Sequence, residues 1–203
     1  MSRSARYFTL GRADREVWFV LHGYGQLAAR FLRHFEPLDD GTRLIVAPEA
    51  LSRFYLTEDP AERRVGASWM TKEDRLAEIG DYVRYLDAVY MAVVGPSPVS
   101  VTVLGFSQGA TTACRWTALG GARVDRLIVW GGEVPPDLDI TKLRGRRLSL
   151  VYGRRDEYFT PKIVAATEAR LREQRVPYDL EPFDGGHEID APVLKKLALT
   201  ADG

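Results

Sequence analysis

The sequence predicts an α/β fold, with a mostly parallel sheet that has helices on both faces. Short apolar runs end repeatedly in glycine or proline, and segments with helical periodicity separate them. The runs are rich in valine, isoleucine and leucine with little alternation, which is typical of strands buried on both faces of a parallel sheet. Since the chain has 203 residues and no linker-like tract, we expect one domain spanning residues 1–203.

Five stretches that begin with an apolar run contain the expected strands, and in chain order they read EVWFVLHGYG, RLIVAPE, VSVTVLGFSQG, RLIVWGGEVP and LSLVYGRRD. A last strand-like run, YDLEPF, follows near the C-terminus. In parallel sheets of this kind, ligands bind beyond the carboxyl ends of the strands, where the connecting loops converge. We therefore expect the residues that directly follow the runs to lie at one rim: residues 22–26, residues 48–51, Ser107, Glu133 and Asp156.

Helix signals occupy the segments between these runs. The stretch from about Lys72 to Val93 has apolar residues three and four apart, which predicts an amphipathic helix. Its expected buried stripe is Leu76, Ile79, Val83, Leu86, Val89 and Val93. Thr160 before Pro161 is typical of a helix start, and Asp190 provides a similar N-cap signal near the C-terminus. In the helix after Thr160 we expect a buried side made by Ile163, Ala166, Ala169 and Leu171 or by residues next to them.

Composition narrows the function classes. Lysine and arginine number 28, as do aspartate and glutamate, so no charge excess favours a nucleic acid or an anionic membrane as partner. No apolar run reaches the roughly 18 residues of a membrane span, and the N-terminus lacks the pattern of an export signal. The single cysteine, Cys114, fits a reducing compartment, so we expect a cytoplasmic protein; its oligomeric state stays open.

A motif with catalytic meaning follows the third strong run. Gly105-Phe106-Ser107-Gln108-Gly109 fits the pattern G-x-S-x-G, a tight strand-to-helix turn that exposes a serine at the top of a sheet. A Cβ atom at either glycine would collide with the neighbouring strand or helix in so sharp a turn. The motif stands after an expected strand and before helix-compatible residues, which is the context that it requires. We therefore expect Ser107 to be a nucleophile.

A serine nucleophile needs a base and an orienting carboxylate. In hydrolases with this turn the chain order is serine, acid, histidine, which selects His187, because His22 and His34 both precede Ser107. Asp156 is the best-placed acid, since it follows a central-looking strand between Ser107 and His187. Glu133, one strand earlier, remains an alternative.

An oxyanion formed at this serine needs hydrogen-bond donors. One expected donor is the backbone N–H of Gln108, at the start of a helix whose dipole favours negative charge. For the other we choose the N–H of Tyr24 in the HGYG segment. His22 and Gly23 are interpreted as structural, with the imidazole pinning the loop. His22 has no companions at metal-ligand spacing, so we expect neither a metal nor another cofactor.

The chain resembles the α/β-hydrolase superfamily, and within it the small carboxylesterase, lysophospholipase and acyl-protein thioesterase family. The resemblance rests on LHGYGQ, APEA, SWM, LGFSQGA, GRRDEYFTP and GGHEI, spread in family order over nearly the whole chain. It implies Ser107 as nucleophile, Asp156 as acid and His187 as base, with the Tyr24 and Gln108 amides as oxyanion hole. The short interval between GGEVP and RRLSLVYG leaves no room for a cap domain.

The acyl pocket departs from the family pattern. The family commonly has an acidic residue or glycine at Gln26 and a W-F-D segment where this chain has Trp69-Met70-Thr71, so substrate preference does not transfer. Aromatic residues expected near the rim are candidates to line the cleft; those selected as substrate-binding are Phe54, Trp69, Phe106 and Tyr158. Apolar walls favour an uncharged acyl or aryl ester over a charged head group.

The sequence thus predicts a cofactor-free serine esterase that acts on small-molecule esters. Two alternatives stay open. One is a lysophospholipase, peptidase or thioesterase with the same triad, because fold and triad do not choose among these substrates. The other is a non-catalytic binding protein on a hydrolase scaffold, which the presence of all three triad residues disfavours.

Overall fold

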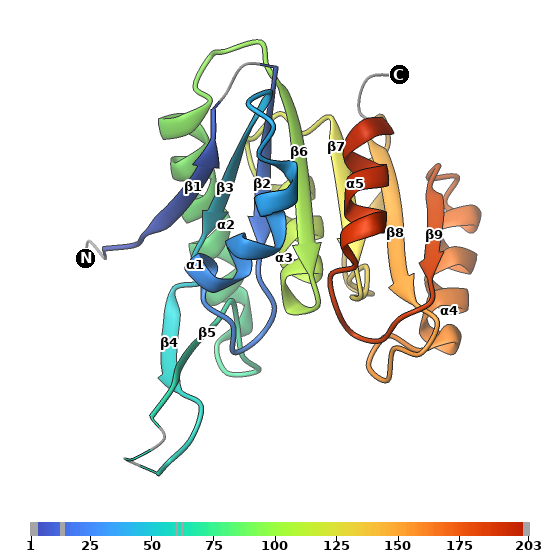
Figure 1. Cartoon of the computed structure of the whole chain (residues 1–203). Coiled ribbons are helices and arrows are strands. Elements are labelled where there is room, and N and C mark those ends of the chain that lie inside the picture. Colours follow the sequence, from blue (N-terminus) through green and yellow to red (C-terminus); the bar gives the residue numbers. More distant parts are fainter. Residues whose placement is uncertain (1–3, 13–14, 60, 62, 201–203) are drawn as a thin grey trace.

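The computed structural model describes residues 4–12, 15–59, 61 and 63–200. Within these residues a seven-stranded sheet has the order β1-β3-β2-β6-β7-β8-β9, and β4 and β5 form a separate two-stranded sheet. All strands of the large sheet run parallel except β1, which pairs antiparallel with β3 (Figure 1). The strands of the large sheet are β1 Tyr7–Gly11, β2 Glu16–Leu21, β3 Arg43–Pro48, β6 Ser100–Phe106, β7 Arg126–Trp130, β8 Arg147–Gly153 and β9 Asp179–Phe183.

The predicted α/β architecture is confirmed. Each of the five strong apolar runs forms a strand of the parallel sheet, and YDLEPF contributes β9. Three strands were not predicted, namely β1, β4 (Ser52–Tyr55) and β5 (Val65–Ser68). β1 and β4 alternate between half-buried and exposed residues, so they lack the continuous apolar run by which the central strands are recognised.

Helices cover both faces of the large sheet. On one face lie α1 (Ala28–Phe31), the 3-10 helix Leu32–Leu38 and α5 (Ala191–Leu199). The other face carries α2 (Arg75–Val93), α3 (Gln108–Leu119) and α4 (Pro161–Glu173), together with the 3-10 helix Ile140–Leu143 (Figure 1). The chain thus forms three layers, as the alternation of strand and helix predicted.

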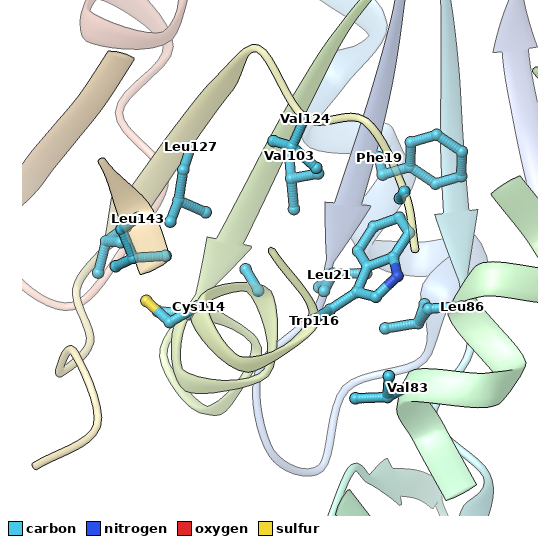
Figure 2. Packing of buried hydrophobic residues seen from close by; sticks show 14 of the residues in the cluster. Phe19, Leu21, Val83, Leu86, Val103, Cys114, Trp116, Val124, Leu127 and Leu143 are labelled. Atoms are coloured by element: carbon cyan, nitrogen blue, oxygen red, sulfur yellow. The ribbon is translucent and has the colours of Figure 1, made fainter. Parts of the chain in front are cut away.

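Two apolar cores result, one on each side of the sheet. Successive residues of β2 alternate between them: Phe19 and Leu21 belong to the core under α2 and α3, and Trp18 and Val20 to the core under α1 and α5. In the first core Phe19 meets the indole of Trp116 edge-on at 5.2 Å between ring centroids, with Leu86 of α2 close by (Figure 2). Burial on both faces holds the strand ends, and therefore the loops after them, in fixed positions.

The helix predictions need correction in detail. The helix expected from Lys72 begins at Arg75, and Leu76, expected in its buried stripe, is 77% exposed because it lies in the first turn, before the buried positions begin. Its buried residues are Ile79, Tyr82, Val83, Leu86, Val89 and Tyr90. In α4 the expected Ala166 and Ala169 are exposed, and the buried residues are Val164, Thr167 and Leu171. Valine and leucine bury more apolar area than alanine, which favours this rotation of the helix.

The helix starts themselves are confirmed. Thr160 and Asp190 are the N-cap residues of α4 and α5, each followed by a proline in the first turn. The Asp190 carboxylate accepts a hydrogen bond from the Val193 amide at 2.8 Å, whereas Thr160 makes no side-chain cap bond. α5 therefore starts at a fixed place directly after the loop that carries His187.

Candidate active site

Ser107 occupies a sharp turn between β6 and α3. β6 ends at Phe106 and α3 begins at Gln108, so Ser107 alone joins the two elements. Its backbone has φ 55° and ψ −119°, a region that side-chain-bearing residues rarely adopt. The Ser107 amide donates to the Trp130 carbonyl of β7 at 2.9 Å, which ties the strained turn to the neighbouring strand. The turn thus fixes the hydroxyl at the carboxyl edge of the sheet.

Two glycines make this turn possible. A Cβ atom on Gly105 would lie 2.1 Å from the Gly109 carbonyl oxygen, and one on Gly109 would lie 2.1 Å from the Leu21 carbonyl oxygen. Neither distance is compatible with a side chain unless the backbone moves. The steric reason given for the two glycines is therefore confirmed.

His187 and Asp156 are joined by a hydrogen bond. His187 Nδ1 lies 2.8 Å from Asp156 Oδ2. The other carboxylate oxygen, Oδ1, accepts from the amides of Tyr158 and Phe159 at 2.8 and 2.9 Å, and Asp156 is only 5% exposed. A carboxylate held by two amides can only accept from the imidazole, so Nδ1 carries the ring proton and Nε2 keeps its lone pair.

The loops after β6, β8 and β9 bring the three predicted triad residues, Ser107, Asp156 and His187, to one edge. The ring of Phe106, next to Ser107, lies 4.8 Å from the His187 ring between centroids. A Cβ atom on Gly131 would lie 3.3 Å from both Asp156 Oδ2 and His187 Nδ1, and one on Gly132 would lie 2.5 Å from the Ser107 carbonyl oxygen. Among the described residues no hydrogen bond joins the Ser107 hydroxyl to His187, and such bonds are often long before substrate binds.

The loop after β2 contacts the serine from the other side. A Cβ atom on Gly23 would lie 3.2 Å from the Ser107 Cβ atom. The side chain of Gln26 accepts from the Gly23 amide at 2.8 Å, a role that sequence reasoning did not foresee for this residue. Within the part of the chain that the structure describes, neither the Tyr24 nor the Gln108 backbone N–H has a hydrogen-bond acceptor. Both donors are therefore available to a ligand.

His22 pins two rim loops together, as predicted. It is fully buried; its Nδ1 donates to the Gly23 carbonyl at 2.8 Å, and its Nε2 accepts from the Ala50 amide at 3.1 Å. These two bonds require the neutral ring with the proton on Nδ1. Burial lowers the pKa of His22 below its usual value of 6.5, although the Gly23 bond and the charge of Glu49 act in the opposite direction.

This pKa shift makes stability depend on pH. Between the lowered pKa and about 6.5 the unfolded chain binds a proton at residue 22 that the folded chain does not, so the free energy of unfolding falls as the pH falls below about 6.5. We expect His22→Gln to have a shallower loss of stability between pH 7.5 and 5.5 than the parent protein, measured by urea unfolding. His34→Gln is the matched control, because His34 is exposed, and should keep the parent slope; equal slopes in all three proteins would contradict the account.

The Gln108 side chain holds the strand β5 against the turn. Its Oε1 accepts from the Trp69 amide at 3.0 Å, and its Nε2 donates to the Met70 carbonyl at 2.9 Å. Trp69, predicted to bind substrate, is 2% exposed and its indole N–H donates to the His22 carbonyl at 2.8 Å. The structure therefore places Trp69 behind the loop, where it supports the site.

The other aromatic candidates lie nearer the surface. Tyr24 is 62% exposed, and its ring lies 5.1 Å from that of Phe54 between centroids, tilted by 33°. On the opposite side Tyr158 is exposed, with its ring 4.9 Å from that of His187. Phe106 is buried, and its ring contacts the His187 ring. Tyr24 and Tyr158 thus come from the loops after β2 and β8, and Phe54 of β4 contacts the Tyr24 ring.

Among the charged side chains near the rim, Arg53 and Arg155 are ion-paired, and Glu133 is exposed. Arg53 donates to Glu49 at 2.6 Å and Arg155 forms an ion pair with Asp184, which leaves both less suited to hold a charged head group. Glu133, the alternative acid, is exposed, and only its backbone carbonyl has a hydrogen bond in the described residues, from the Thr111 hydroxyl at 3.2 Å. No group of three or more His, Cys, Asp or Glu side chains that could hold a metal occurs among the residues described.

The fold is that of the α/β-hydrolases. The chain superimposes on a carboxylesterase from Mesorhizobium loti with a TM-score of 0.76 at 21% identity, covering 97% of this chain and 95% of that one. An acyl-protein thioesterase 2 from Zea mays gives a TM-score of 0.74 at 16% identity over 98% and 99% of the chains, and esterase PE8 gives 0.73 at 20% identity over 98% of each. No protein-family model matches the sequence, and no curated protein is similar to it in sequence.

Over the described residues, no helix is long and apolar enough to cross a membrane.

Proposed function

We propose that the protein is a serine esterase that cleaves small to medium acyl esters through an acyl-enzyme, with Ser107, Asp156 and His187 as catalytic triad. The observation that carries the proposal is the 2.8 Å bond between His187 and buried Asp156 at the same sheet edge as the strained Ser107 turn. A serine hydroxyl attacks an ester at neutral pH only when a base takes its proton, and this arrangement supplies an oriented base.

In the first half of the reaction the Ser107 oxygen attacks the ester carbonyl while His187 Nε2 takes the hydroxyl proton. The buried Asp156 carboxylate stabilises the imidazolium that forms. When the tetrahedral intermediate collapses, the carbon–oxygen bond to the alcohol breaks and the imidazolium gives the leaving alkoxide its proton. Water then repeats the sequence on the acyl-serine: His187 takes its proton, the acid leaves, and the proton returns to the serine oxygen.

The oxyanion of each tetrahedral intermediate would be bound by the backbone N–H groups of Tyr24 and Gln108. The support is that both amides lack an acceptor in the described residues, while Gln108 begins α3, whose dipole favours negative charge. His22 and Gln26 hold the loop with Tyr24, and the Gln108 side chain fixes its own residue to β5. These bonds prepare the donors before substrate arrives, which is the condition for strong electrostatic stabilisation.

The substrate class is proposed from the walls of the site. Tyr24, Phe54 and Tyr158 offer aromatic surface, with Phe106 beneath the His187 ring, whereas Arg53 and Arg155 are already engaged by carboxylates. This favours an uncharged acyl or aryl ester over a phosphate-bearing lipid. Trp69 is not among the residues proposed to contact the substrate, because it is buried under the loop after β2.

The likeness in fold to a carboxylesterase and to an acyl-protein thioesterase, together with the motifs GFSQG and GGH, supports the same branch of hydrolases. We propose a single catalytic domain, active in the cytoplasm without a cofactor or cap domain. Burial raises the pKa of the only thiol, that of Cys114, to about 12, so this thiol is not ionised at neutral pH and does not compete with the proposed serine nucleophile.

A substrate panel tests the proposal. Purified protein is assayed with p-nitrophenyl esters of increasing acyl length, an acyl-CoA and a lysophospholipid under the same conditions. We expect the highest kcat/KM among the short and medium p-nitrophenyl esters, with each added methylene that the site buries contributing up to about 0.8 kcal/mol. A preference for acyl-CoA or lysophospholipid would support the alternative substrates with the same triad, and no turnover of any member would contradict the proposal.

A further inference from the structure

A groove at the amino ends of the strands gathers three arginines. Ser100, Arg126 and Arg147 are the first residues of the neighbouring parallel strands β6, β7 and β8. Together with Thr102, Arg123 and Asp125 they line a cavity of about 360 Å³, which we call the arginine groove. The loops at the other ends of the same strands carry Ser107 and Asp156, so the groove and the proposed active site lie at opposite edges of the sheet.

Arg126 is a buried cation without an anionic partner among the described residues. It is 4% exposed, and its Nη1 and Nη2 donate to the Leu197 carbonyl at 2.6 Å and the Thr200 hydroxyl at 3.4 Å, both neutral. Its Nε is buried and has no hydrogen-bond partner there. Burial and the charge of Arg147 lower the pKa of Arg126 to about 10, although the charges of Glu16, Asp179 and Glu181 act in the opposite direction, so it stays charged at neutral pH. A buried charge without a counter-ion is unfavourable, and an anion in the groove would relieve this.

The two other arginines extend the positive surface to the solvent. Arg123 donates to the Val99 carbonyl at 3.0 Å and lies 3.6 Å from Asp125, and Arg147 donates to the Thr200 carbonyl and lies 3.4 Å from Asp179. Their side chains are 60% and 42% exposed. The charged residues that line the groove are thus three arginines and one aspartate, an excess of two positive charges.

Asp125 is already counted in this excess, and its carboxylate accepts from the Val101 amide at the groove wall at 2.9 Å. A role of Arg126 as a cap for the carbonyls of α5 would explain its bond to Leu197, but it would explain neither the cavity nor the two further arginines around it. Guanidinium groups bind phosphate oxygens with paired hydrogen bonds, and the hydroxyls of Ser100 and Thr102 add donors of matching chemistry.

We propose that the arginine groove binds a phosphate group, carried either by free phosphate or by a small phosphate monoester. β6 has seven residues, which at the rise of a parallel strand places the groove about 20 Å from Ser107. The groove is therefore a second site, separate from the one that would hold the ester, and it does not depend on the proposed catalytic function.

The test is a calorimetric titration of the full chain with inorganic phosphate, at a fixed ionic strength set with sodium chloride. We expect saturable binding of one phosphate per chain, and an affinity at least about tenfold lower in the double variant Arg123→Gln/Arg147→Gln. The matched control is Arg84→Gln/Arg172→Gln, which removes two exposed, ion-paired arginines elsewhere and so changes the net charge equally. Circular dichroism verifies that both double variants are folded.

Absence of saturable binding up to about 10 mM phosphate, or an equal loss of affinity in both double variants, would overturn the proposal. A parallel titration with glycerol phosphate distinguishes the two sources: tighter binding than that of free phosphate indicates a monoester, and equal or weaker binding indicates free phosphate. Ser107→Ala should bind phosphate with unchanged affinity, which separates this result from the outcome of the esterase assays.

Discussion

Replacing Ser107 by alanine should lower kcat for a p-nitrophenyl ester by on the order of 10⁶. The substitution removes the attacking oxygen but keeps the Cβ atom and the strained turn, whose amide is tied to Trp130. The proposed oxyanion donors and the aromatic residues proposed to contact the substrate stay in place, so the variant should still bind substrate with a similar KM. The loss therefore falls on the chemical step, and a kcat measurement at saturating ester detects it.

Ser97→Ala is the control for this experiment. Ser97 is an exposed serine in the loop before β6, and its removal should leave kcat unchanged. A Ser107→Ala protein that keeps near-parent esterase activity would show that another group attacks the ester.

Replacing Asp156 by asparagine should lower kcat by roughly 10⁴ while the fold stays intact. The asparagine carbonyl can still accept from the Tyr158 and Phe159 amides, so its NH₂ group points at His187 Nδ1. A donor at this place favours the tautomer with the proton on Nε2, and such a ring cannot take the proton of Ser107. The expected loss is smaller than that of Ser107→Ala, because the nucleophile and the oxyanion donors remain.

Glu133→Gln is the matched substitution at the alternative acid. Its side chain is exposed and Asp156 already holds the histidine, so we expect parent-like kcat. Full activity of Asp156→Asn together with loss of activity in Glu133→Gln would move the role of the acid to Glu133.

The central sheet was predictable because its strands are buried on both faces. Runs such as EVWFVL and RLIVW have no polar interruption, and each became a central strand with side chains in both cores. The edge strand β1 and strand β4 were not predicted, since their residues alternate in exposure over only five and four positions. β5 was missed because it has only four residues, VGAS, of which only the valine and the alanine have apolar side chains. The helical spacing of apolar residues was visible in the sequence. Which of these residues are buried at the ends of a helix depends on how far the sheet beneath it extends, and Leu76, at the start of α2, is exposed for this reason.

The residues of the candidate site were predictable where a short sequence motif or the order of residues along the chain determines them. The turn around Ser107 demands two glycines, and chain order selects His187 and Asp156, so the sequence alone pointed to residues whose loops meet. The hydrogen bonds that support the site could not be predicted from the sequence. The side chains of Gln26 and Gln108 and the ring of His22 hold backbone groups of the rim loops, up to 39 positions away along the chain, and a pattern of residue types carries no such information. Trp69 was misplaced for the same reason, because its indole is directed to a backbone carbonyl.

The most direct test of an activated serine is covalent labelling with a fluorophosphonate, followed by mass spectrometry of the labelled peptide. An activated hydroxyl displaces fluoride and becomes phosphonylated, whereas an ordinary serine does not react. We expect one adduct per chain, on Ser107, with labelling strongly slowed in His187→Ala and absent in Ser107→Ala. An unlabelled protein, as expected for a binding protein on a hydrolase scaffold, or an adduct on a different residue would contradict the account.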